Sequence, residues 1–173
     1  PHARFDANLR SYDYFIHTYK HPFLNDVSSL YLIRNLNLDN MKTATALLPL
    51  YKDYKSFCIT PADQDSTICH VASAGWLADS SGDRLRFQIS ANRFLSRMIR
   101  IIVGKLLQVG AGMLSLDEFE SYLSTETTPK SLSAAYPQGL YLSKVTYPYL
   151  DLAPRSSISA ILQSHTATSW KAV

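Results

Sequence analysis

Three arginines lie in one short segment, Arg93, Arg97 and Arg100, at a spacing that could bring their side chains together. If a helix runs from Arg93 to about Val109, the i, i+4 and i+7 positions place the three guanidinium groups on one face, with apolar residues on another. Guanidinium groups keep their charge and bind phosphate or carboxylate through a fixed fork of N–H donors. The spacing therefore predicts an anion-binding helix, and an ordinary solvated helix face is the alternative.

Other reactive side chains form no familiar catalytic motif. The sequence contains no glycine-rich phosphate loop, no G-x-S-x-G and no H-E-x-x-H. Asp53 is interpreted as a turn or cap residue. Tyr12 and Tyr14 could stack on a base or pass a proton, although their period-two spacing favours packing. We interpret the scattered histidines as surface or packing residues. They are His2, His17, His21, His70 and His165.

The composition is that of one globular domain. The 173 residues are 46% hydrophobic and 18% charged, with a formal net charge of +3; this charge permits a nucleic-acid partner without requiring one. No apolar run approaches the ~20 residues that a membrane-spanning helix needs. Cys58 and Cys69 form no metal-binding motif, so we expect two reduced, structural thiols.

The elements that would position these side chains follow from hydrophobic periodicity. The segment Ser11–Tyr19 alternates and predicts a strand. Asp39 can cap a helix that ends near the next proline. Two further alternating runs, 68–77 and 84–90, flank a Ser-Ser-Gly-Asp turn and predict an antiparallel hairpin.

The second half of the chain continues with helix and strand. The arginine helix should stop at the glycines after Val109, and Gly104 inside it predicts a close backbone contact, because a mid-helix glycine costs about 1 kcal/mol relative to alanine. Ser115 to Glu118 is a capping box for a helix that reaches Leu123. The segment from Leu140 to Tyr147 is a predicted strand.

Together these elements predict an α+β fold, an antiparallel sheet with helices packed on one face. Residues 1–150 are expected to form this αβ domain. Residues 151–173 are expected to be a tail rich in Ser and Thr, with one short helix near Ser156 to Leu162.

Seven short elements, in this order and spacing, resemble those of the TruA-type tRNA pseudouridine synthases. They are HARFDA from His2, RSYDY from Arg10, Asp53 with Ser56-Phe57, ANRFL from Ala91, MIRIIVG from Met98, Val109-Gly110 and GLYL from Gly139. The resemblance extends from His2 to Tyr147 and leaves the tail uncovered. It implies the pseudouridine synthase fold, in which two αβ halves join their antiparallel sheets across a basic cleft.

The resemblance also implies an activity. Enzymes of this family isomerise uridines at positions 38 to 40 of the tRNA anticodon stem-loop without a metal or organic cofactor. An aspartate attacks the flipped uridine, the glycosidic bond breaks, and the base rotates and rejoins through carbon. By position in the motifs, Tyr12 would stack on the flipped base and could transfer a proton, Arg100 would pair with the nucleophilic aspartate, and Leu140 would line the uracil pocket.

The same resemblance implies partners. Arg84, Arg86, Arg93 and Arg97 would contact tRNA phosphates, or serve as simple surface charges. A homodimer in the cytoplasm, with tRNA touching both subunits, is the expected assembly.

One departure from the family pattern is large. The family's nucleophile lies in a Gly-Arg-Thr-Asp motif, and no Arg-Thr-Asp occurs in this sequence. We therefore interpret the chain as the carboxy-terminal half of such an enzyme, inactive alone and in need of an amino-terminal catalytic half. Two alternatives are a non-catalytic RNA-binding domain and a dimerisation module that pairs through the strand at 140–147.

Overall fold

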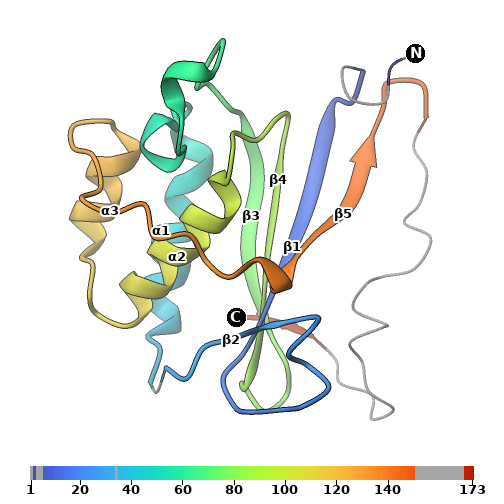
Figure 1. Ribbon diagram of the computed structural model, residues 1–173, viewed down its shortest axis with the longest axis vertical. Coiled ribbons are helices and arrows are strands. Elements are labelled where there is room, and N and C mark those ends of the chain that lie inside the picture. Colours follow the sequence, from blue (N-terminus) through green and yellow to red (C-terminus); the bar gives the residue numbers. More distant parts are fainter. Residues whose placement is uncertain (1, 3–5, 34, 151–169) are drawn as a thin grey trace.

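The computed structural model describes residue 2 and residues 6–33, 35–150 and 170–173. Within them, a six-stranded sheet has helices packed on one face, as Figure 1 shows, which confirms the predicted α+β class. The strands are β1 (Leu9–His17), β2 (Ser29–Leu30), β3 (Val71–Ala78), β4 (Arg84–Ala91), β5 (Leu140–Thr146) and β6 (Lys171–Ala172). The helices are α1 (Leu38–Leu47), α2 (Met98–Gly110) and α3 (Leu116–Leu123).

Strand β1 is paired along both of its edges. β4 runs antiparallel along one edge, over nearly the whole of β1. The other edge is shared by β5, which is antiparallel beside residues 9–14, and by β2, which is parallel beside Ile16 and His17. The sequence predicted an antiparallel sheet, and four of the five pairings are antiparallel; the short parallel strand β2 makes the sheet mixed.

The β3–β4 hairpin forms where the alternating pattern predicted it. Leu85, Phe87 and Ile89 point toward the helices and are buried in the main core. Trp76 packs on Phe87 across the two strands, with ring centroids 5.0 Å apart. Its indole N–H donates to Thr45 Oγ at 3.0 Å, which ties β3 to α1.

The helix caps agree with the sequence in one case and differ in another. Ser115 caps α3, because its Oγ accepts from the Glu118 N–H at 3.1 Å, as predicted. Asn37, and not Asp39, caps α1: the Asn37 Oδ1 accepts from the Asn40 N–H at 3.0 Å. Asp39 lies inside the first turn, where a carboxylate still favours the positive end of the helix dipole.

Helix α2 is buried on nearly all sides. It ends at Gly110, close to the predicted stop. The close contact predicted at Gly104 is confirmed, since a Cβ atom there would lie 2.5 Å from the carbonyl oxygen of Ser133. The segment that leads from α3 to β5 crosses α2 at this point (Figure 1).

A smaller apolar cluster lies on the sheet face opposite the main core. Phe15 and Leu24 are buried there, with Val27, Tyr141 and Trp170 packed around them. The sequence did not predict β6, which pairs with β3 next to Trp170. The tail helix expected at 156–162 lies outside the described residues.

The described residues also settle the state of the two cysteines and the length of the apolar helices. Cys58 and Cys69 are both buried and free, as predicted. No helix among the described residues is long and apolar enough to span a membrane.

Candidate active site

The turn between β4 and α2 decides where the arginines lie. The Asn92 Oδ1 accepts from the backbone N–H of Arg93 at 2.9 Å and of His70 at 2.8 Å. Arg97 has a left-handed backbone, with φ of 58°, and α2 begins only after it. The predicted row of three arginines on one helix face is therefore wrong: Arg93 and Arg97 precede the helix, and Arg100 alone lies in it. Asn92, a residue that favours turns, was the sequence signal for this break.

The Arg100 side chain is anchored at one end and available at the other. Its Nε donates to the Ala135 carbonyl oxygen at 2.6 Å, and the Ala135 N–H donates back to the Arg100 carbonyl oxygen at 2.8 Å. Among the described residues, no hydrogen-bond acceptor is found for its two terminal amino groups. A half-buried guanidinium held in this way presents a fixed fork that suits a carboxylate.

Tyr14, a residue of β1 that lies close enough to Arg100 to feel its charge, has a structural role. It is fully buried, and its hydroxyl donates to the Tyr136 carbonyl oxygen at 2.6 Å and lies 2.8 Å from Ser29 Oγ. Burial raises the pKa of the Tyr14 phenol, and the nearby charge of Arg100 lowers that pKa by less. The phenol therefore stays neutral and holds the segment that carries Ala135.

Tyr12 and Leu140 lie on the same face of the sheet as Tyr14. Tyr12 is two residues before Tyr14 in β1, and its ring meets Phe94 edge to face, with centroids 5.2 Å apart at 84°. Leu140 pairs opposite Tyr14 across β1 and β5, so its side chain shares that face. Both side chains are half-buried. The structure thus groups Tyr12, Arg100 and Leu140 around one stretch of β1, and their catalytic roles stay predictions.

Arg84 and Arg86 lie on the opposite face of the sheet from this group, because they alternate with the buried Leu85 and Phe87. Arg86 pairs with Asp13 through Nη2 and Oδ2 at 2.8 Å. Arg84 pairs with Asp79 through Nε and Oδ2 at 3.0 Å. Their side chains are only 12–14% exposed, so both are already held by carboxylates.

The two carboxylates on that face have structural partners. Burial works to raise the pKa of Asp79, but hydrogen bonds and charge from Arg84 outweigh it and hold that pKa below its ordinary value. Asp13 accepts from Arg86 and also from Gln88 Nε2, at 3.0 Å. Because Asp13 alternates with Tyr12 along β1, it points to the opposite face of the sheet from Tyr12.

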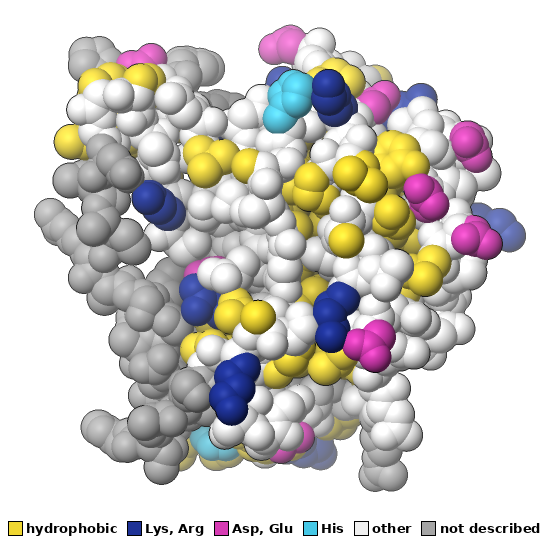
Figure 2. Space-filling view, turned by 180° about the vertical axis from the view of Figure 1, so that it is seen from behind, with side chains coloured by type: hydrophobic (Ala, Val, Ile, Leu, Met, Phe, Trp, Pro, Cys, Tyr) yellow, Lys and Arg dark blue, Asp and Glu magenta, His cyan; other side chains and the backbone are white. Residues whose placement is uncertain are grey.

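Basic side chains do not merge into one patch on the face seen in Figure 2, where Lys and Arg stand apart from one another. Arg97 is exposed and Arg93 is half-buried. No group of three or more His, Cys, Asp or Glu side chains is placed to hold a metal ion within the described part of the chain. Asp53 accepts from Lys55 N and Thr67 Oγ, as expected of a turn residue.

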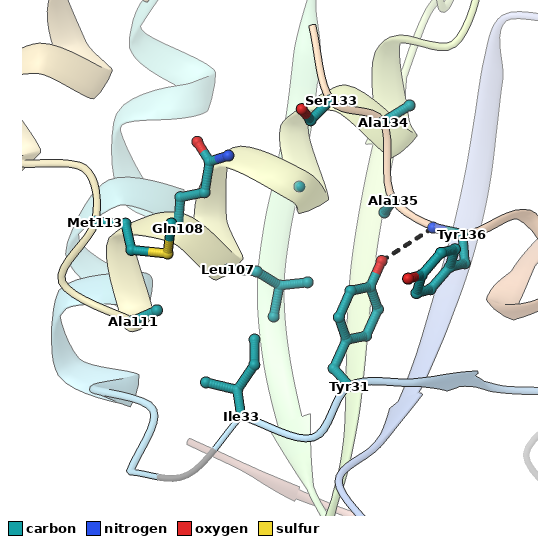
Figure 3. Close-up of a pocket in the computed structure, with 11 residues that line it drawn as sticks. Tyr31, Ile33, Leu107, Gln108, Ala111, Met113, Ser133, Ala134, Ala135 and Tyr136 are labelled. Atoms are coloured by element: carbon teal, nitrogen blue, oxygen red, sulfur yellow. Dashed lines mark hydrogen bonds between the residues drawn. The ribbon is translucent and has the colours of Figure 1, made fainter. Parts of the chain in front are cut away.

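A cavity of about 290 Å³ lies beside the segment that anchors Arg100 (Figure 3). Tyr31 and Tyr136 form one side of it, stacked with ring centroids 5.1 Å apart. The Tyr136 N–H donates to the Tyr31 hydroxyl at 2.9 Å, the dashed line in Figure 3. Tyr31, Ala135 and Tyr136 were not identified from the sequence, and only the close contact expected at Gly104 pointed to this region.

Comparison with known proteins gives consistent matches. The sequence model of a family described as tRNA pseudouridine synthase matches residues 51–148. The tRNA pseudouridine synthase A of Porphyromonas gingivalis is 37% identical over 147 residues, which are 85% of this chain and 58% of that protein. Its counterpart in Bacteroides fragilis is 38% identical over 85% of this chain and 58% of its own length. That of Bacillus subtilis is 34% identical over 84% and 59%. The chain spans just under three fifths of each relative.

Proposed function

Because this chain belongs to the tRNA pseudouridine synthase family, we propose that it is the carboxy-terminal part of an enzyme that isomerises uridine to pseudouridine in the tRNA anticodon stem-loop. The observation that carries the proposal is the guanidinium of Arg100, which is anchored through Nε and open at its terminal amino groups. It lies on the helix-covered side of the sheet, the side that also carries Tyr12 and Leu140. Such a fork is suited to a carboxylate that must stay ionised.

In this proposal an amino-terminal half of the same protein supplies the nucleophilic aspartate. Arg100 binds that carboxylate and keeps it charged. The uridine leaves the base stack at a cost of a few kcal/mol, and Tyr12 stacks on it while Leu140 forms the apolar wall. The carboxylate adds to the flipped nucleotide, and the glycosidic C–N bond breaks. The base rotates and its C5 bonds to the ribose C1′. The carboxylate is released, C5 loses its proton and N1 gains one, so that the product is an isomer of uridine.

Substrate binding and assembly are part of the same proposal. The exposed Arg97 and the half-buried Arg93 are suited to tRNA phosphates. Arg84 and Arg86 could contact tRNA phosphates only while they also pair with Asp79 and Asp13. We further propose that the assembled enzyme is a cytoplasmic homodimer that acts without a cofactor.

The test is pseudouridine formation in an anticodon stem-loop transcript. The chain is mixed with a separately made amino-terminal half that carries the Arg-Thr-Asp motif, and complex formation is verified by gel filtration. We expect activity from the mixture, none from the chain alone, and loss of activity in Arg100→Ala.

Two results would count against the proposal. A verified complex that forms no pseudouridine would favour a non-catalytic RNA-binding or dimerisation role. An Arg100→Ala complex as active as the parent would remove the role of Arg100 while leaving the family assignment in place.

A further inference from the structure

We propose that Gly104 and the backbone of Ala135 are positioning residues that fix the direction in which the Arg100 fork points. This inference rests on the proposed function, in which Arg100 binds the nucleophilic carboxylate. Neither residue needs to touch the substrate. They act through Arg100 alone.

The first step is the reciprocal contact between Arg100 and Ala135. The side-chain Nε donates to the Ala135 carbonyl at 2.6 Å, and the Ala135 N–H donates to the Arg100 backbone carbonyl at 2.8 Å. Ala135 is 3% exposed, so water does not compete for these bonds. With Nε engaged, the side chain can offer only its two terminal amino groups as a pair, which limits a bidentate carboxylate to one approach.

The second step is the space that Gly104 leaves on α2. Gly104 lies one helical turn after Arg100, and so on the same face of α2. A Cβ atom at position 104 would lie 2.5 Å from the Ser133 carbonyl oxygen and 3.4 Å from the Ala135 nitrogen. Those are backbone atoms, so the segment from Ser133 to Ala135 would have to shift by about 1 Å to restore ordinary contact.

The third step is that the far end of this segment is held to the sheet. The Tyr136 carbonyl accepts from Tyr14, and the Tyr136 N–H donates to Tyr31. Ser133 is exposed, and the cavity in Figure 3 lies alongside. A side chain at position 104 would therefore displace the Ser133–Ala135 backbone, including the buried Ala135, between the tethered Tyr136 and helix α2. The carbonyl that holds Arg100 is in the displaced part.

The experiment compares three Gly→Ala variants. In Gly104→Ala the new methyl group meets backbone. Gly110→Ala, in the same helix, meets side chains instead: Met41 Sδ at 2.5 Å, Met41 Cγ at 2.8 Å and Leu36 Cδ2 at 3.0 Å. Gly75→Ala meets nothing within 4 Å. The chain is labelled with ¹⁵N, and the Arg100 Nε–H resonance and its exchange with water are measured. The complex with the amino-terminal half is then assayed on the stem-loop transcript.

We expect Gly104→Ala to lose the protected Nε–H signal and to lower kcat by roughly 10- to 100-fold, as expected for a displacement of about 1 Å near the reacting groups. KM for the transcript should not change, because the proposed phosphate contacts, Arg93 and Arg97, lie outside the displaced Ser133–Ala135 segment. The two control variants should keep the signal and a kcat close to that of the parent. A Gly104→Ala chain with the parent's signal and kcat would overturn the inference, as would an equal kcat loss in Gly110→Ala.

If Gly104→Ala does not fold, Tyr31→Phe tests the same inference. Tyr31→Phe removes the acceptor for the Tyr136 N–H without altering α2. It should weaken Nε–H protection and lower kcat by a smaller factor, and no change in either would overturn the inference. If the parent complex itself forms no pseudouridine, the proposed function fails, whereas the resonance still decides whether Gly104 and Ala135 position Arg100.

Discussion

The ion pair between Asp13 and Arg86 should be one of the most costly polar contacts to break in this fold. Asp13 is 1% exposed, and Arg86 is 14% exposed. Asp13→Ala would leave the guanidinium buried without a counter-charge. It would also remove the acceptor of Gln88 Nε2, while Arg86 Nε already lacks a hydrogen-bond partner.

The expected loss of unfolding free energy is about 3–5 kcal/mol, the usual cost of removing one member of a buried pair. Domains of this size are stable by about 5–15 kcal/mol, so the change is large. With a urea slope of about 2 kcal/mol/M, the unfolding midpoint should fall by roughly 2 M.

Asp39→Ala is the matched control. Asp39 pairs with Lys42 at 2.9 Å, nearly the same length, but the two side chains are 89% and 41% exposed. Water screens this pair, so its removal should cost at most about 1 kcal/mol, including the helix-dipole effect. The assay is urea unfolding followed by tryptophan fluorescence and circular dichroism.

Equal losses in Asp13→Ala and Asp39→Ala would refute the reasoning, because burial would then not decide the strength of the pair. A third protein, in which both members of the ion pair are replaced, tests whether the loss in Asp13→Ala comes from leaving Arg86 buried without its counter-charge. The double variant Asp13→Leu with Arg86→Met should lie within about 2 kcal/mol of the parent, since a buried pair can be replaced by apolar side chains at little cost.

Three further predictions concern the site and the pH response. Tyr12→Phe keeps the edge-to-face contact with Phe94. The rate of pseudouridine formation by the assembled enzyme should be unchanged if Tyr12 only stacks, and should fall ~10²-fold or more if Tyr12 transfers a proton. Single-turnover kinetics distinguish the two outcomes. Arg97→Ala should weaken tRNA binding and lower the slope of log K against log salt by about 0.9, if Arg97 contacts one phosphate; filter binding at several salt concentrations measures this. The pKa of Asp79 is lowered in the folded state. Its ionised carboxylate therefore stabilises the fold above the ordinary carboxyl pKa of 3.8, and this stabilisation is lost as pH falls through the folded pKa. Asp79→Asn should be less stable than the parent at neutral pH, and its free energy of unfolding should fall less than the parent's when the pH is lowered.

Local features of the fold could be predicted from the sequence. The alternation in β1 and in the β3–β4 hairpin, the Ser115 cap and the close contact at Gly104 each depend on a few neighbouring residues. The arginine row failed because a helical pattern was extended through the Asn92 turn, where the apolar Leu95 fits either structure. The cap of α1 was placed at Asp39 for a similar reason, since Asn37 and Asp39 are both good caps.

Long-range features could not be predicted in this way. The ion pairs of Arg84 and Arg86 join residues whose proximity only the folded sheet creates. The Ala135 carbonyl that holds Arg100 is a backbone group, and the residue type at position 135 gives no sign of it. The motifs identified the family without these details, because motifs record which side chains recur and not what positions them.

The double pairing of β1 has a consequence for how the chain folds during synthesis. The partner residues of β1 in β4 lie 73 positions later in the sequence, as for Asp13 and Arg86. Those in β5 lie 132 positions later, as for Ser11 and Ser143. At a synthesis rate of ~5–20 residues per second, β4 is completed roughly 4 to 15 seconds after β1, and β5 is completed later still. The β3–β4 hairpin closes a short loop and can form as soon as it leaves the ribosome. The strand that carries Tyr12 is therefore made well before β4 and β5, and it is among the last strands to be paired along both edges.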